Sequence, residues 1–223
     1  MTCTTHQIED MTYLEYRTGP RETPDALPCV LVLHWMGAQP QDMLPLCTDF
    51  PLPARFLIPS GSYPCQPGYS WYPLDFYQRP LEQQAPIIRA TAARVAAFLH
   101  AATQQVPCRG KPFAMGMSQG GDLSYALAAY HSDLIAGALP LGARWSPEFP
   151  RLIGELTAAP HPPIWAFHGA ADPIVPLAEV EAGVAWLRQR GIVAQLQSYP
   201  EVGHGISRQM IADMHRVLQR AMA

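Results

Sequence analysis

The chain has 223 residues, of which 48% are hydrophobic and 15% charged, and its net charge at pH 7 is −3. This length suits one α/β domain with a sizeable core, so we expect a single domain over residues 1–223. The composition indicates neither a basic surface for nucleic acid nor a polybasic membrane contact, and no apolar run approaches membrane-spanning length. The expected partner is therefore a small, largely uncharged molecule.

Short apolar runs in the first part of the chain predict buried strands. Residues 11–18 predict an opening edge strand, and Cys29–Leu33, a dense run of β-branched and leucine side chains, predicts a central strand. We expect a short helix around residues 43–47 and a third strand over residues 55–58. Residues 60–73 are rich in Gly, Pro, Ser and Tyr and predict a long irregular loop, which in compact domains usually has a function.

Helices and strands alternate in the rest of the chain. Residues 86–102 carry apolar side chains at helical spacing, and the apolar run 112–117 predicts a strand that leads directly into a helix over residues 122–130. The remaining expected elements are a strand over 134–141, a helical segment over 147–157, a strand over 163–167, a helix over 177–190, a strand over 193–199 and a helix capped by Ser207 that runs towards Ala223. This alternation predicts a mostly parallel central sheet with helices on both faces.

A Gly-x-Ser-x-Gly sequence stands where the strand over 112–117 turns into the next helix. This context is typical of a nucleophile elbow, in which Ser118 occupies a strained backbone position and small residues must stand two before and two after it. Gly116 and Gly120 meet that need. The helix that follows directs its free amides and the positive end of its dipole at Ser118, where an oxyanion would form.

Three residues that follow predicted strands have the chemistry of a catalytic triad. In open α/β sheets, functional groups gather at the carboxyl ends of the strands, and Ser118, Asp172 and His204 occur in the chain order of an α/β-hydrolase triad. His204 would take the proton of Ser118, and Asp172 would fix the tautomer of His204 and stabilise its imidazolium. We assign the two oxyanion-hole amides to Gln119, directly after the nucleophile, and to Met36, on the loop after the first central strand.

Four segments are distinctive in combination. They are Val-Leu-His-Trp-Met-Gly at 32–37, Gly-Met-Ser-Gln-Gly-Gly at 116–121, His-Gly-Ala-Ala-Asp-Pro-Ile-Val-Pro at 168–176 and Gly-His-Gly-Ile at 203–206. Together they resemble the phospholipase/carboxylesterase branch of the α/β-hydrolases, which includes the acyl-protein thioesterases. The resemblance spans about residues 29–215 and implies an α/β-hydrolase fold without a large cap domain, whose Ser-Asp-His triad hydrolyses acyl esters or thioesters.

The sequence departs from the family pattern at two places. Trp35 stands where the family usually has the glycine of Leu-His-Gly, and Pro73 follows Trp71-Tyr72 where an aspartate is common. Trp35 is therefore expected to reshape the acyl pocket or to displace the amide of Met36. Trp71 resembles a residue that lines the family's site, and of two interpretations, a pocket wall or a packed aromatic, we favour the wall. The predicted substrate-binding residues are thus Trp35 and Trp71.

The cysteine and histidine patterns predict neither a metal nor a cofactor. The five cysteines, at positions 3, 29, 47, 65 and 108, are widely spaced and include no Cys-x-x-Cys pair, which argues against a disulfide framework or a zinc site and suits a reducing compartment. The first twenty residues lack the apolar core of a signal peptide, so we expect a cytoplasmic protein. His34 and His168 are expected to hold loops by hydrogen bonds.

These residues predict a serine esterase that hydrolyses short to medium acyl esters or thioesters through an acyl-enzyme on Ser118. Fold and triad do not determine the leaving group, so lactonase, peptidase or perhydrolase activity on the same triad is one alternative. A hydrolase-fold binding protein that has lost catalysis is another. A homodimer is compatible with the sequence, which does not determine the oligomeric state.

Overall fold

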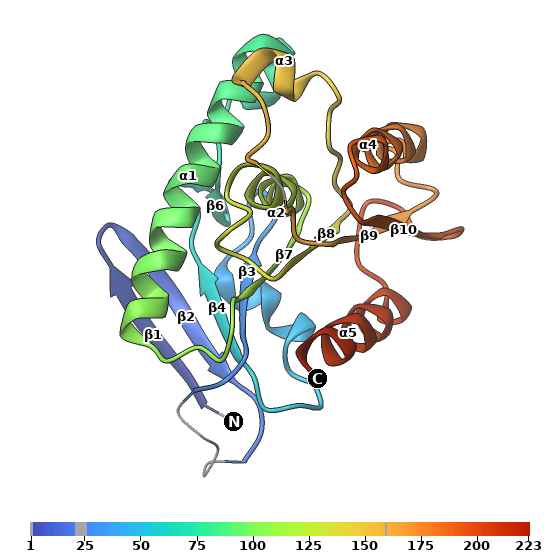
Figure 1. Ribbon diagram of the computed structural model, residues 1–223. Helices are drawn as coiled ribbons and strands as arrows, with labels where there is room; N and C mark the ends of the chain where they lie inside the picture. Colours follow the sequence, from blue (N-terminus) through green and yellow to red (C-terminus); the bar gives the residue numbers. More distant parts are fainter. Residues whose placement is uncertain (1, 21–25, 159) are drawn as a thin grey trace.

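Continuous apolar runs form the middle of the sheet in the computed structural model, which describes residues 2–20, 26–158 and 160–223. Every residue of β3, β7 and β8 is buried, as strands covered on both faces require. The eight-stranded sheet has the order β1-β2-β4-β3-β7-β8-β9-β10 (Figure 1). Its strands are β1 Thr2–Ile8, β2 Met11–Arg17, β3 Cys29–Leu33, β4 Arg55–Pro59, β7 Phe113–Met117, β8 Gly137–Leu141, β9 Ile164–Gly169 and β10 Ala194–Tyr199. Strand β2 runs antiparallel to both of its neighbours, and the remaining strands of this sheet, β4, β3, β7, β8, β9 and β10, are parallel to one another.

Helices cover both faces of the sheet. They are α1 Leu81–Gln105, α2 Gln119–Tyr130, α3 Phe149–Ile153, α4 Leu177–Gln189, α5 Arg208–Met222 and the short 3-10 helices η1 Pro40–Leu46 and η2 Phe76–Gln78. Alternate residues of β3 belong to different cores: Leu31 and Leu33 are part of the core that contains the buried residues of α1, α2 and α4, whereas Val30 and Val32 are part of the core that contains those of η1 and α5. The expected mostly parallel sheet with helices on both faces is confirmed (Figure 1).

Two expectations about local structure are wrong. Residues 11–18 were expected to form an edge strand, but β2 lies inside the sheet because the polar strand β1 pairs with it from Thr2 opposite Arg17 to Ile8 opposite Met11. The segment 60–73 is not wholly irregular, because β5 Tyr63–Cys65 and β6 Gly68–Ser70 form a hairpin within it. The expected cap of α5 is confirmed, since the side chain of Ser207 accepts a hydrogen bond from the backbone of Met210.

The cysteine pattern argued against a disulfide framework, but the structure contains a disulfide. Cys29 and Cys108 are joined by a disulfide, with their Cα atoms 5.7 Å apart, although 79 positions separate them in the chain. Cys29 begins β3 and Cys108 lies just before β7, the strand beside β3, so the sheet brings the two side chains together. Disulfides are rare in reducing compartments, so this bond argues against the expected cytoplasmic location.

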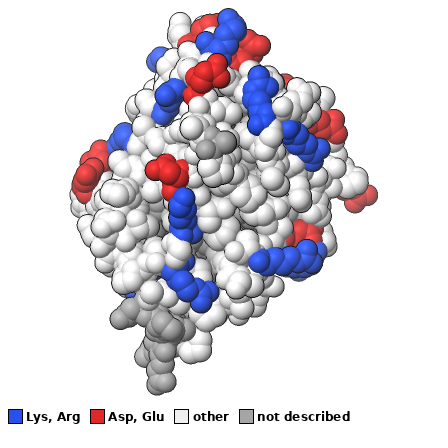
Figure 2. Space-filling model, in the orientation of Figure 1, with Lys and Arg blue, Asp and Glu red and all other residues white. Residues whose placement is uncertain are grey.

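The surface carries no strong charge of one sign on the face shown in Figure 2, where acidic and basic side chains alternate over a mostly uncharged surface. Within the described ranges, no helix is both long and apolar enough to cross a membrane. In the same residues, no group of three or more His, Cys, Asp or Glu side chains is arranged to hold a metal ion.

Candidate active site

Ser118 lies in the sharp turn between β7 and α2, with φ 55° and ψ −116°. This left-handed region is strained for a residue with a side chain, and the neighbouring glycines make it accessible. A Cβ atom added to Gly116 would lie 2.4 Å from the backbone of Gly120, and one added to Gly120 would lie 2.1 Å from the carbonyl oxygen of Leu33. The turn therefore requires glycine at both positions and presents Ser118 at the carboxyl edge of the sheet.

His204 lies between Ser118 and Asp172 and contacts both side chains. Its Nδ1 lies 2.7 Å from Asp172 Oδ2, and its Nε2 lies 3.1 Å from Ser118 Oγ. An ionised carboxylate only accepts hydrogen bonds, so Nδ1 carries the proton and Nε2 is the acceptor for the serine hydroxyl. The close approach of the two loops depends on Gly169, where an added Cβ would lie 2.2 Å from the carbonyl oxygen of Val202. The structure thus brings together all three residues predicted for the triad.

Asp172 is held in its ionised form by donors on its own loop. Its Oδ1 accepts hydrogen bonds from the backbone of Ile174 at 2.8 Å and of Val175 at 2.9 Å. Burial raises the pKa of Asp172, but the bonds from Val175, His204 and Ile174 together outweigh burial and leave the pKa below its ordinary value. His168 donates from Nε2 to the carbonyl oxygen of Val175 at 2.8 Å, so it supports this loop as expected.

Two backbone amides near Ser118 are available to an oxyanion. In the part of the chain that the structure describes, the N–H groups of Met36 and Gln119 donate no hydrogen bond within the protein. Gln119 begins α2, so its amide also lies at the positive end of the helix dipole. These are the two residues predicted for the oxyanion hole.

The loop that carries Met36 is held by a neutral histidine. His34 donates from Nδ1 to the carbonyl oxygen of Trp35 at 2.7 Å and accepts at Nε2 from the backbone of Gly61 at 2.9 Å. Burial lowers the pKa of His34 to about 4, so the ring keeps this donor and acceptor pattern at neutral pH. Trp71 stacks on the ring of His34 and donates from Nε1 to its carbonyl oxygen at 2.9 Å.

This role corrects the prediction for Trp71. Its side chain is only 1% exposed, and it lines neither of the cavities beside Ser118, so it is a packed aromatic and not a pocket wall. Trp35, the other predicted substrate-binding residue, is partly exposed and lines the larger cavity together with Met36.

The side chain of Gln119 has a structural role that the sequence does not indicate. It is fully buried, and its Oε1 accepts hydrogen bonds from the backbone of Trp71 at 3.0 Å and the hydroxyl of Ser70 at 3.2 Å. It therefore ties the end of the β5–β6 hairpin to the start of the nucleophile helix. No pattern near Gln119 could indicate these partners, because they lie 48 and 49 positions away.

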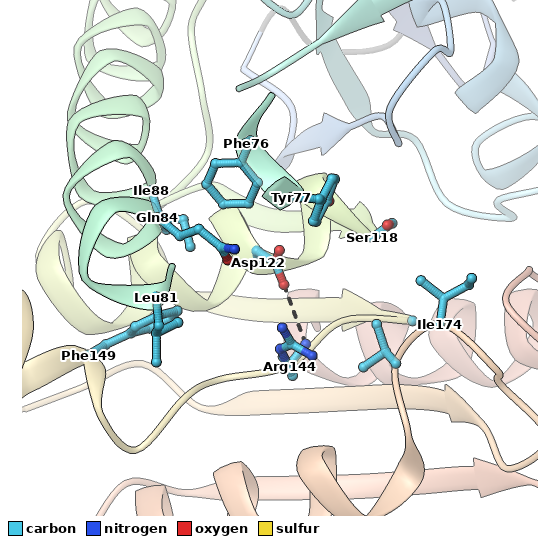
Figure 3. A pocket seen from close by; sticks show the side chains of 12 residues that line it. Phe76, Tyr77, Leu81, Gln84, Ile88, Ser118, Asp122, Arg144, Phe149 and Ile174 are labelled. Atoms are coloured by element: carbon cyan, nitrogen blue, oxygen red, sulfur yellow. Dashed lines mark hydrogen bonds between the residues drawn. The ribbon is translucent and has the colours of Figure 1, made fainter. Parts of the chain in front are cut away.

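Two cavities flank Ser118. The larger, of about 990 Å³, contains Trp35, Met36, Met117, His204, Ile206 and Ile211 in its wall. The smaller, of about 100 Å³, is lined by residues that include Phe76, Ile88, Asp122, Arg144 and Phe149 (Figure 3). Tyr77 and Ile174 belong to both walls and separate the two spaces. No pattern in the sequence around Asp122 indicates that its side chain lines a cavity.

Comparisons with known proteins identify the family and the fold. Residues 22–222 match the model of a family described as Phospholipase/Carboxylesterase. The chain is 25% identical over 209 residues to carboxylesterase SOBER1 of Arabidopsis thaliana, with 86% of this chain and 90% of that protein covered. It is 24% identical over 198 residues to a probable inactive carboxylesterase of Oryza sativa subsp. japonica, with 79% of this chain and 78% of that protein covered. The crystal structure of a Bacillus cereus carboxylesterase has the same fold, with a TM-score of 0.77, 18% identity and 95% of both chains covered.

Proposed function

The chain belongs to the phospholipase/carboxylesterase family of α/β-hydrolases, and we propose that it is a serine hydrolase that cleaves short to medium acyl esters or thioesters through an acyl-enzyme on Ser118. The observation that carries the proposal is the pair of hydrogen bonds from Ser118 to His204 at 3.1 Å and from His204 to Asp172 at 2.7 Å. A serine hydroxyl is a weak nucleophile at neutral pH and needs an oriented base of this kind.

The first half of the reaction acylates Ser118. His204 Nε2 takes the hydroxyl proton while Ser118 Oγ attacks the carbonyl carbon, and the ionised Asp172 stabilises the imidazolium that forms. The amides of Met36 and Gln119 hold the negative oxygen of the tetrahedral intermediate, and each donor of this kind contributes about 3 kcal/mol. The intermediate then collapses, and the departing alcohol or thiol takes its proton from His204 Nε2.

The second half releases the acid. A water molecule enters on the side vacated by the leaving group, gives a proton to His204 Nε2 and attacks the acyl carbon. The same amides stabilise the second tetrahedral intermediate, and its collapse returns the proton to Ser118 Oγ. The free carboxylic acid then leaves, and the triad regains its starting protonation state.

Intact-mass spectrometry after treatment with a fluorophosphonate tests the activated serine. Wild type is expected to gain one adduct, which Ser118→Ala loses and Ser198→Ala, an exposed serine on β10, keeps. A folded wild type without an adduct would contradict the proposal. It would support the binding-protein alternative, which the relative named as probably inactive makes worth testing.

A substrate panel then identifies the leaving group. Turnover of p-nitrophenyl esters or acyl thioesters supports the esterase or thioesterase assignment. Cleavage of peptide anilides without ester turnover would contradict it and favour a peptidase on the same triad.

A further inference from the structure

A carboxylate lies in the wall of the smaller cavity and has no role in the proposed chemistry. Asp122 is one helical turn after Ser118, and its backbone N–H donates to the carbonyl oxygen of Ser118 at 2.9 Å. The rest of this wall is largely apolar and includes Phe76, Leu81, Ile88 and Phe149 (Figure 3). An acidic side chain in a largely apolar wall costs folding free energy. Its presence therefore suggests a function, such as binding a ligand.

The protein satisfies the carboxylate of Asp122 only weakly. Its Oδ1 accepts one long hydrogen bond, of 3.4 Å, from the backbone of Arg144. The guanidinium of Arg144 instead binds Glu179 at 2.5 Å. Among the described residues, no side chain donates a hydrogen bond to Asp122, whereas an ionised carboxylate offers about four acceptor sites. Asp122 is only partly enclosed and lines the cavity, so it can accept a donor from a molecule bound there.

The triad determines which part of a substrate enters this cavity, and this step rests on the proposed function. The leaving group must take its proton from His204 Nε2, so it must lie on the side of Ser118 where His204 is accessible. His204 lines the larger cavity and not the smaller one. The acyl group therefore points into the smaller cavity, whose volume of about 100 Å³ suits a short chain.

We propose that the smaller cavity is a subsite for a short acyl group that carries a hydroxyl, and that this hydroxyl donates a hydrogen bond to the carboxylate of Asp122. A neutral donor fits better than an ammonium group because the cationic Arg144 lines the same cavity. A purely alkyl chain would remove water from Asp122 and supply no hydrogen-bond donor in return. The carboxylate would then be left unpaired, so the site should discriminate against alkyl acyl groups.

The acid–base behaviour of Asp122 is consistent with this subsite. Burial raises its pKa to about 7, and the nearby Arg144 only partly opposes that rise. Above that pH the carboxylate is ionised and accepts a hydrogen bond from a hydroxyl. The test is therefore made at pH 8.

Matched pairs of p-nitrophenyl esters test the proposal, because a methyl group replaces a hydroxyl at nearly constant size. One pair is 3-hydroxybutanoate and 3-methylbutanoate, and the other is lactate and 2-methylpropanoate. Wild type is expected to prefer the hydroxyacyl ester at least tenfold in kcat/KM in one pair. Asp122→Leu is expected to abolish or reverse that preference, and Asp122→Asn, which keeps an acceptor oxygen, to retain part of it.

Fluorophosphonate labelling of the same samples separates failure of this proposal from failure of the proposed function. Labelled wild type with equal kcat/KM for both members of both pairs would overturn the hydroxyacyl subsite and leave the serine hydrolase intact. A preference that Asp122→Asn and Asp122→Leu both retain would also overturn it, as would faster turnover of the 3-aminobutanoate ester. If Asp122→Leu fails to fold, the proposal is still tested by the ratio of kcat/KM for the two members of each pair, measured for wild type and for Asp122→Asn.

Discussion

The carboxyl group of Asp122, which is partly enclosed in the wall of the smaller cavity, should make the stability of the protein fall as the pH rises. Burial raises its pKa from 3.8 to about 7. The folded state then binds the proton more tightly than the unfolded state, so the stabilisation is complete below pH 3.8 and is lost as the pH rises to about 7. One unit of pKa corresponds to 1.36 kcal/mol, so the loss reaches about 4 kcal/mol, and water in the cavity makes this an upper value.

Asp122→Asn removes this titration. The variant should therefore gain stability over wild type as the pH rises, by up to about 4 kcal/mol between pH 4 and pH 8, with most of the gain complete by pH 7. For a chain of this length the gain corresponds to roughly 10 °C in Tm. Urea and thermal unfolding at several pH values measure it, and taking the difference between variant and wild type cancels the other titrating groups.

The matched control is Asp133→Asn, because Asp133 is exposed on the surface. The difference in free energy of unfolding between Asp133→Asn and wild type should not rise with pH as it does for Asp122→Asn. If the stabilities of wild type and Asp122→Asn run parallel from pH 4 to pH 8, the carboxylate is well solvated in the cavity. That result would refute the reasoning from burial.

Three further predictions address the triad, the oxyanion loop and the disulfide. Asp172→Asn should lower kcat for a p-nitrophenyl ester by about 10⁴-fold, because asparagine favours the wrong tautomer of the catalytic histidine; a loss below tenfold would contradict the triad. Trp71→Phe removes the bond to the carbonyl oxygen of His34 and leaves the oxyanion loop less firmly held, so kcat should fall about tenfold with KM nearly constant, less than the 10²–10³-fold cost of losing an oxyanion donor outright; unchanged kcat would limit Trp71 to packing. Alkylation of the denatured protein should label the three free cysteines without reductant and all five with it. Replacing both Cys29 and Cys108 by serine should lower stability by about 4.5 kcal/mol by the loop-entropy model, and five labels without reductant would refute the bond.

Local physics made much of the architecture predictable from the sequence. Strands buried on both faces need continuous apolar runs. The run Cys29–Leu33 therefore predicts β3, and the run before Ser118 predicts β7. The sharp turn at Ser118 could be predicted because it needs glycine two positions before and two positions after the serine, where Gly116 and Gly120 stand. Asp172 and His204 could be named because each follows a strand whose carboxyl end lies at the same edge of the sheet.

Other features depend on residues that only the folded chain brings together. The polar strand β1 exists because β2 offers it a partner, and its own composition does not indicate a strand. Cys29 and Cys108 meet because β3 and β7 are neighbours in the sheet.

The sequence by itself determined the buried central strands, the main helices, their alternation and the three residues predicted for the triad, because each depends on a few consecutive residues. Only the tertiary structure decided that Trp71 is buried against His34, that the side chain of Gln119 holds the hairpin, and that Asp122 faces a cavity. These environments are formed by segments far apart in the chain, and burial and hydrogen-bond partners are properties of that packing and not of any local pattern.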